Sequence, residues 1–134
     1  MLRLDAMLID LRTYTLKIGS VRDFLALYAA EGLAVQSAHL GSPLGYYTTE
    51  VGELSQLVHL WQYQDMADRE RRRAALEADP RWLAYRSKSS TCGHVVRQQN
   101  SLLQTVDFAA PGLTNVGNAS NFVVAGIGSN TPNP

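Results

Sequence analysis

Apolar and polar side chains alternate along several segments of the chain, and this alternation is typical of β-strands. Three strands are predicted at residues 7–16, 45–51 and 56–63. A fourth, at 95–103, is weaker because glutamine and asparagine occupy its centre. Only a short turn separates the second strand from the third, so we expect these two to form an antiparallel hairpin.

Two other segments repeat apolar residues at the spacing of an amphipathic helix. Residues 21–36 follow Ser20, which is a good N-cap, and Gly32 is expected to loosen or end this helix. Residues 66–78 form the second predicted helix, with Asp65 as its N-cap.

Pro80 is expected to stop the second helix, because the residue before a proline avoids the helical conformation. One further helical turn is predicted at 81–85 and a polar connector at 87–93. Beyond the last strand the composition changes: residues 109–134 are rich in Gly, Asn, Pro and Ser and carry no charge. The chain is therefore predicted to contain one domain, residues 1–108, followed by a mostly irregular tail.

The predicted order of elements is β-α-β-β-α-β, which defines the ferredoxin-like α+β fold. In this fold the four strands form one antiparallel sheet, and both helices cover the same face. The opposite face is left open, and it must meet solvent, a ligand or another subunit.

The third predicted strand suggests which side chains lie on the open face. Val58 and Leu60 are aliphatic and suit a position beneath helices, together with Ile9 and Leu11 of the first strand. The other face of this strand carries His, Trp and Tyr side chains, whose polar tips need partners when they are buried. We therefore expect the open face to carry Asp10, Arg12, Tyr14, His59, Trp61 and Tyr63, with Tyr46 or Tyr47 from the second strand, of which Tyr47 is assigned to the pocket.

A face so rich in aromatic rings favours an interaction site over bare exposure to water. Packing against a second copy about a two-fold axis would cover it. The sequence therefore predicts a homodimer that closes a barrel-like cavity, in which a small organic ligand could bind.

Composition narrows the class of protein. The chain has 134 residues, and its 12 Lys and Arg balance its 12 Asp and Glu, which argues against binding to nucleic acid. No apolar run approaches the ~20 residues that a membrane span needs. The first residues lack the features of a signal or transit peptide. Cys92 is the single cysteine, so an internal disulfide is excluded and a cytoplasmic location is expected.

Several stretches resemble the NIPSNAP family, above all VHLWQY and ADRERRRAAL in the block from the hairpin to the second helix. LRTYTLKIGSVRDFLALYAAEGLAVQ and the later VVRQQNSLL are also similar, so the resemblance covers about residues 8–103. It implies a dimeric α+β barrel and a homodimer, and it implies no established reaction. The chain departs from the family pattern in its polar fourth strand and in its Gly/Asn-rich tail.

His59 is the first candidate for chemistry, since an imidazole can act as acid or base near neutral pH. The competing interpretation is a buried histidine that only satisfies a hydrogen bond. Arg12 could fix an anionic group, or it could form a structural pair with Asp10, with Glu50 or with a residue of a second subunit. Tyr14 would be a secondary donor, and the predicted pocket walls are Asp10, Trp61, Tyr63 and Tyr47, all of which could instead be interface core.

Other polar features favour structural roles. The basic run from Arg69 to Arg73 is diluted by acidic residues, and a solvated helix face with an Arg73–Glu77 pair is expected. Cys92 and His94 have too few companions for a zinc site, and no phosphate-binding loop or nucleophile motif occurs. No metal and no cofactor are predicted.

The leading hypothesis is a NIPSNAP-like homodimer that binds a small ligand or a protein partner. One alternative is a cofactor-independent enzyme, an oxygenase or isomerase that uses His59. Another is a purely structural interaction module whose interior is filled by side chains. A cavity of a few hundred Å³ beside Arg12 and His59 would favour the ligand or enzyme hypotheses.

Overall fold

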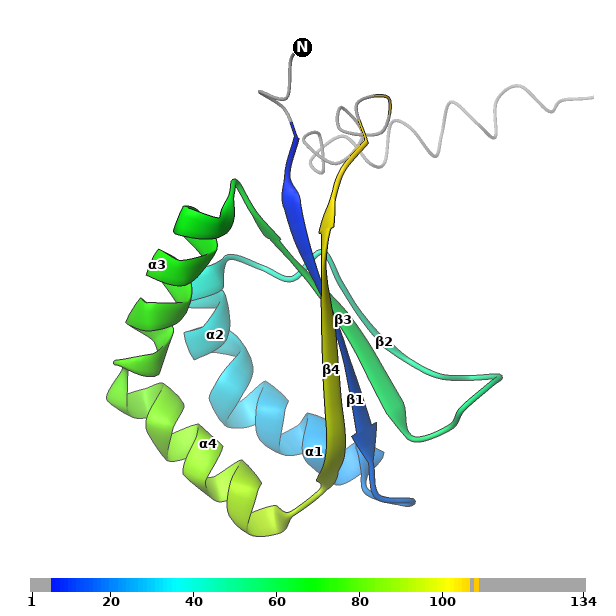
Figure 1. Ribbon diagram of the computed structural model, residues 1–134. Coiled ribbons are helices and arrows are strands. Elements are labelled where there is room, and N and C mark those ends of the chain that lie inside the picture. Colours follow the sequence, from blue (N-terminus) through cyan, green and yellow to red (C-terminus); the bar gives the residue numbers. More distant parts are fainter. Residues whose placement is uncertain (1–5, 107, 109–134) are drawn as a thin grey trace, which may run out of the picture. The chain divides into compact units, whose positions relative to one another are not determined.

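The computed structural model describes residues 6–106 and 108, and its strands form one four-stranded antiparallel sheet in the order β2-β3-β1-β4. Figure 1 shows the helices gathered on one side of this sheet. This arrangement is the predicted ferredoxin-like α+β fold, which is confirmed. The elements are β1 (Leu8–Leu16), α1 (Val21–Leu27), η1 (Tyr28–Gly32), α2 (Leu33–Leu40), β2 (Gly45–Thr48), β3 (Gln56–Tyr63), α3 (Met66–Glu77), α4 (Pro80–Cys92) and β4 (Val95–Gln104).

The first helical segment is continuous but changes its winding in the middle, where η1 is a single π-helical stretch. Gly32 lies at the end of this stretch, as the sequence predicted for a loosened helix. A Cβ atom at Gly32 would lie 2.8 Å from the Tyr28 ring and 3.0 Å from the Tyr85 ring of α4. The glycine therefore allows α4 to pack closely on η1.

The second helical segment differs from the prediction after Pro80. The expected connector at 87–93 is wrong, because α4 continues to Cys92. Asp79 is the N-cap, its carboxylate accepting a hydrogen bond from the Arg81 amide, so Pro80 begins a helix rather than stopping one. Gly93 ends α4 in the left-handed conformation, with φ of 66°.

Of the two predicted N-caps, one is confirmed. The Asp65 side chain accepts a hydrogen bond from the Asp68 amide at 2.7 Å. Ser20 precedes α1 but makes no capping bond, because its hydroxyl donates to the Lys17 carbonyl at 2.6 Å. The second strand is also shorter than predicted and ends at Thr48.

The faces of the sheet are the reverse of those predicted. Trp61, Tyr63 and Leu57 of β3 are fully buried in the core cluster, together with Phe24 of α1 and Trp82 of α4. The aromatic and polar positions therefore lie beneath the helices. Val58, Leu60 and Leu11 alternate with them on the open face, where each is only partly buried.

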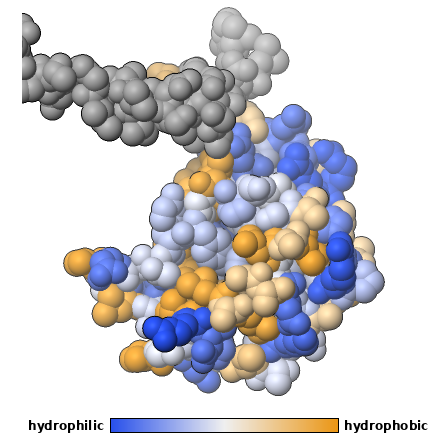
Figure 2. All heavy atoms as spheres, turned by 180° about the vertical axis from the view of Figure 1, so that it is seen from behind, coloured by the Kyte–Doolittle hydropathy of each residue, from blue (hydrophilic) through white to orange (hydrophobic). Residues whose placement is uncertain are grey.

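The reversal has a physical cause: several of the polar tips find partners under the helices, where Arg12 bonds Asp10 and the Trp61 indole bonds His59. Exposed aliphatic side chains are, by contrast, common on protein surfaces. Figure 2 shows that hydrophobic side chains form patches among hydrophilic ones on the surface seen from behind, and the exposed apolar residues include Tyr47, Val51, Leu54 and Leu103.

Residues 7–104 form a compact unit. The predicted tail, residues 109–134, lies outside the described residues, so the boundary at 108 stays a prediction. Within the described part of the chain no helix has the length and apolar character needed to cross a bilayer.

Candidate functional site

A cavity of about 750 Å³ lies between the helix-covered face of the sheet and the helices. Its far wall comes from α4 and from the start of β4, where exposed residues such as Leu83, Arg86 and Val96 leave it open to solvent. Most of its lining is aromatic, and the rings that line the cavity are Tyr14, Phe24, Tyr28, Tyr46, Trp82 and Tyr85.

His59 lies on the inner wall of this cavity, held by rings on three sides. Tyr46 stacks on the imidazole with centroids 4.5 Å apart and planes 12° from parallel. Tyr14 meets it edge-on at 4.7 Å. The Trp61 indole donates a hydrogen bond to His59 Nδ1 at 2.7 Å, so the orientation of the imidazole is fixed.

These contacts also fix the protonation state of His59. Burial and the neighbouring Arg12 guanidinium lower the pKa of His59 to about 3, so the ring is neutral at physiological pH. Because an indole N–H can only donate, Nδ1 must accept, and the ring proton lies on Nε2. This Nε2–H is buried and has no hydrogen-bond partner among the described residues. His59 therefore offers a donor rather than a base.

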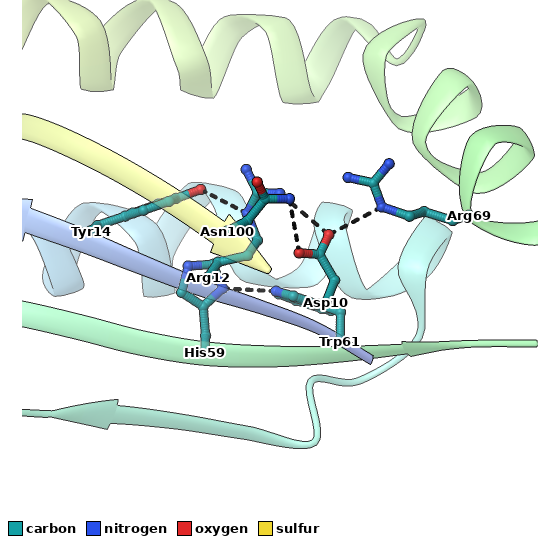
Figure 3. Close-up of polar contacts among 7 residues, drawn as sticks. All are labelled: Asp10, Arg12, Tyr14, His59, Trp61, Arg69 and Asn100. Carbon is teal, nitrogen blue, oxygen red and sulfur yellow. Dashed lines mark hydrogen bonds and ion pairs between the residues drawn. The ribbon is translucent and has the colours of Figure 1, made fainter. Parts of the chain in front are cut away.

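Asp10 lies behind this site as the centre of a buried polar network. Its side chain is fully buried, and Oδ2 accepts from Arg12 Nη1 at 3.3 Å and from Arg69 Nε at 3.2 Å. Asn100 of β4 donates to the other oxygen at 3.2 Å. Figure 3 shows these side chains, with Tyr14, His59 and Trp61, on the side of the sheet where the helices lie.

Arg12 connects this network to the cavity. Its Nε atom donates to the Tyr14 hydroxyl at 3.4 Å, and its guanidinium carbon lies 5.8 Å from the centre of the Tyr14 ring. Burial tends to lower the pKa of Arg12, but Tyr14 and Asp10 raise it overall, so the charge is retained. Arg12 also lines a smaller cavity of about 110 Å³ together with Arg73, Glu77 and Arg86. Tyr14 and Trp82 line both cavities, so the two are adjacent.

Comparison with known proteins identifies the family. The sequence profile of the NIPSNAP family matches residues 9–110. The chain belongs to the NIPSNAP family. An uncharacterised NIPSNAP-like domain protein from Burkholderia xenovorans is 41% identical, with a TM-score of 0.72 over 76% of this chain and 87% of that one. A NIPSNAP family protein of unknown function from Agrobacterium tumefaciens is 35% identical, with a TM-score of 0.71 over 76% of this chain and 90% of that one.

A longer NIPSNAP relative is also known by sequence. The NipSnap homolog of Dictyostelium discoideum is 32% identical over 81 residues, which are 60% of this chain and 35% of that protein. The matched region therefore spans about a third of the relative's length, and nothing about the activity of the whole relative transfers directly.

The structure brings together most of the site residues predicted for this NIPSNAP chain. His59 and Tyr14 line the large cavity, and Arg12 lines the small one. Asp10 and Trp61 lie behind the wall and hold Arg12 and His59 in place. Their predicted position on an open, dimer-forming face is wrong, since they are buried within one subunit.

The two remaining predicted wall residues have different outcomes. Tyr63 is buried under the helices and lines neither cavity. Tyr47 points to the opposite face and is 57% exposed, so its assignment to the pocket is wrong. Its neighbour Tyr46 takes the place, because Tyr46 pairs with His59 across the strands and shares its face.

Several contributing residues were missed by the sequence analysis. Trp82 and Tyr85 are one helical turn apart, and that spacing could have marked one wall if α4 had been predicted at its full length. Arg69 was expected on a solvated helix face, but its side chain is 17% exposed and bonds Asp10. The predicted ion pair between Arg73 and Glu77 does not form in the described part of the chain, because Glu77 bonds Arg86 at 2.6 Å instead.

The described residues contain no cluster of three or more His, Cys, Asp or Glu side chains placed to hold a metal ion. His39 is engaged elsewhere, with Nε2 at 2.8 Å from Asp79 Oδ2. What the site provides is an aromatic cavity with a neutral donor on its wall and arginines at one end.

Proposed function

We propose that this protein binds a small, partly apolar organic molecule in the cavity between its sheet and helices. The observation that carries the proposal is a cavity of about 750 Å³ lined by six aromatic rings and by His59, whose Nε2–H has no partner among the described residues. Ligand sites are typically apolar cavities of ~300–1,000 Å³ with a few placed polar groups.

The competing hypotheses fit these observations less well. An interaction module with a filled interior would lack a cavity of this size. An enzyme that uses His59 as acid or base would need a pKa nearer to neutrality than about 3. A neutral imidazole can still polarise a carbonyl by donating a hydrogen bond, so His59 as an electrophile is the form of the enzyme hypothesis that the geometry favours.

Thermal-shift screening against small organic acids and hydrophobic metabolites tests the binding proposal, since a ligand of the folded state raises the melting temperature. The variant Ser89→Phe adds a ring to a residue that lines the cavity, and it should abolish the shift. Ala84→Phe adds the same ring to an exposed position of α4 outside both cavities, and it should leave the shift intact. Flat results across the library, or equal shifts in both variants, would contradict the proposal.

The protein also forms a homodimer through the open face of its sheet. The support is the partly exposed aliphatic surface of Leu11, Val58 and Leu60, which is flanked by Tyr47 and Leu103. Apolar side chains gathered on one face mark an interaction site more often than a bare surface. This face replaces the aromatic one expected from the sequence.

Sedimentation velocity at micromolar concentration tests the dimer. The variant Leu60→Glu should give a single subunit, because it places a charge in the centre of the contact. Val51→Glu, at a position that is 91% exposed beyond the end of β2, is the matched control and should remain dimeric. A native chain that sediments as a single subunit would refute the dimer and leave the cavity proposal standing.

A further inference from the structure

Two residues of the large cavity each carry a buried N–H donor that has no acceptor among the described residues. The donors are Nε2 of His59 and Nε1 of Trp82, in side chains of residues that are 1% and 8% exposed. Both residues line the large cavity. A buried donor without an acceptor is destabilising, so two such groups beside one cavity indicate that the occupant supplies acceptors.

The arginines near these donors indicate the charge of that occupant. The small cavity is lined by three arginines and one carboxylate, that of Glu77. Arg86 bonds Glu77, and Arg12 shares the Asp10 carboxylate with Arg69. Arg73 forms no ion pair with any described residue, although Arg69 and Arg72 of the same helix both bond carboxylates. Positive charge therefore exceeds negative charge at this end of the site.

Trp82 joins the two features, since it lines both the large and the small cavity. Guanidinium groups recognise carboxylates through paired hydrogen bonds, and the aromatic rings of the large cavity suit a flat apolar body. We infer, on the basis of the proposed function, that the occupant is an aromatic carboxylate. Its ring lies among the tyrosines, and its carboxylate accepts from His59 or Trp82 and neutralises Arg73.

Two probes of nearly equal shape test this inference, namely 2-naphthoate and its neutral amide, 2-naphthamide. Calorimetry on the full chain should show the acid binding on the order of tenfold more tightly than the amide, because a hydrogen bond to a charged group is stronger than one to a neutral group. The amide keeps one carbonyl acceptor but replaces the second carboxylate oxygen with an NH2 donor, so the probes differ in charge and in one hydrogen-bonding group while their shape is nearly the same.

Variants of one helix locate the charge effect. Arg73→Gln should weaken naphthoate about tenfold and leave naphthamide unchanged, and Arg73→Lys should fall in between, because it keeps the charge without the paired donors. Arg71→Gln is the matched control: the Arg71 side chain is 70% exposed and lines neither cavity, so both probes should bind as before. In nitrogen-15 NMR spectra the Nε2–H signal of His59 or the indole signal of Trp82 should shift on addition of naphthoate.

The outcomes separate this inference from the proposed function. Equal affinity for the two probes, or naphthoate binding that Arg73→Gln does not weaken, would overturn the aromatic carboxylate while leaving a cavity that binds small molecules. Naphthoate binding that survives Ser89→Phe would also overturn it, since the probe would then lie elsewhere. If neither probe binds but other library members do, the inference fails and the proposed function stands.

Discussion

The two faces of the sheet differ in the opposite sense from that expected of a buried and an exposed surface. The covered face carries charged and aromatic side chains, including Asp10, Arg12 and His59, and it encloses a cavity. The open face carries aliphatic side chains such as Leu11, Val58 and Leu60. The face that the helices bury is therefore the one whose polar side chains form hydrogen bonds, and not the one with the more apolar side chains.

The difference teaches that a helix layer can cover a polar face when its charged groups are paired with one another. The Asp10 carboxylate accepts hydrogen bonds from Arg12, Arg69 and Asn100, and the Trp61 indole donates one to His59. A network of this kind is costly when it is incomplete, because each buried charge needs its partner. An aliphatic face has no polar groups that need partners, so it can stay partly exposed until another surface packs on it.

Removing the carboxylate at the centre of the buried network should have the largest effect on the stability of the covered face. Asp10→Asn keeps the shape of the side chain but leaves two arginines without their carboxylate, and we expect a loss of about 3 kcal/mol in the free energy of unfolding. Urea denaturation measures it. Glu50→Gln, the same chemical change at an exposed residue, should stay within about 0.5 kcal/mol. Similar losses in both variants would mean that the network is not the source of stability.

The adjacent tyrosines of β2 sharpen the comparison, since they point to opposite faces. Tyr46→Ala removes the ring that stacks on His59 and lies 5.2 Å from Tyr28, so we expect a loss of about 2 kcal/mol and weaker ligand binding. Tyr47→Ala removes a ring that is 57% exposed, and its effect on the stability of the isolated subunit should be under about 0.5 kcal/mol. Denaturation at low protein concentration compares the two, and a larger effect at Tyr47 would reverse our assignment of the faces.

Counted per pH unit, the pH dependence of stability gives the smallest expected effect. The pKa of His59 is lowered to about 3 in the folded chain, against an ordinary value of 6.5, so between these values the unfolded chain binds more protons. Stability should therefore fall as the pH falls from 6.5 toward 3, with His59 contributing at most about 1.4 kcal/mol per pH unit. His59→Gln should flatten the slope in this window, and an unchanged slope would mean that His59 is not buried in neutral form.

Much of the fold could be predicted from the sequence, because alternation and helical spacing are local signals. The four strands, their antiparallel order and the Asp65 cap are of this kind. The extent of α4 was missed because Pro80 can either end a helix or begin one, and the choice depends on the Asp79 cap. Alternation separates a strand into two faces, but it does not say which face the helices cover.

The candidate site was predicted in part for the same reason. His59, Arg12 and Tyr14 were correctly grouped, since residues that alternate on paired strands share a face. Arg69, Arg73 and Asn100 could not be found in this way. Their roles depend on contacts between distant elements, and the predicted helix face gave no sign that two of its arginines turn inward.

The turn between β2 and β3 has a consequence for the distant cavity. Gly52 and Ser55 adopt positive φ values of 126° and 64° there, and the pairing that follows sets Tyr46 opposite His59. Side chains alternate along a strand, so a slip of β2 by one residue against β3 would exchange the faces of the two tyrosines. The Tyr46 ring would then point to water, and the Tyr47 ring would face the imidazole from a different position along the strand. The number of residues in this turn is thus part of what defines the shape of the large cavity, even though none of them lines it.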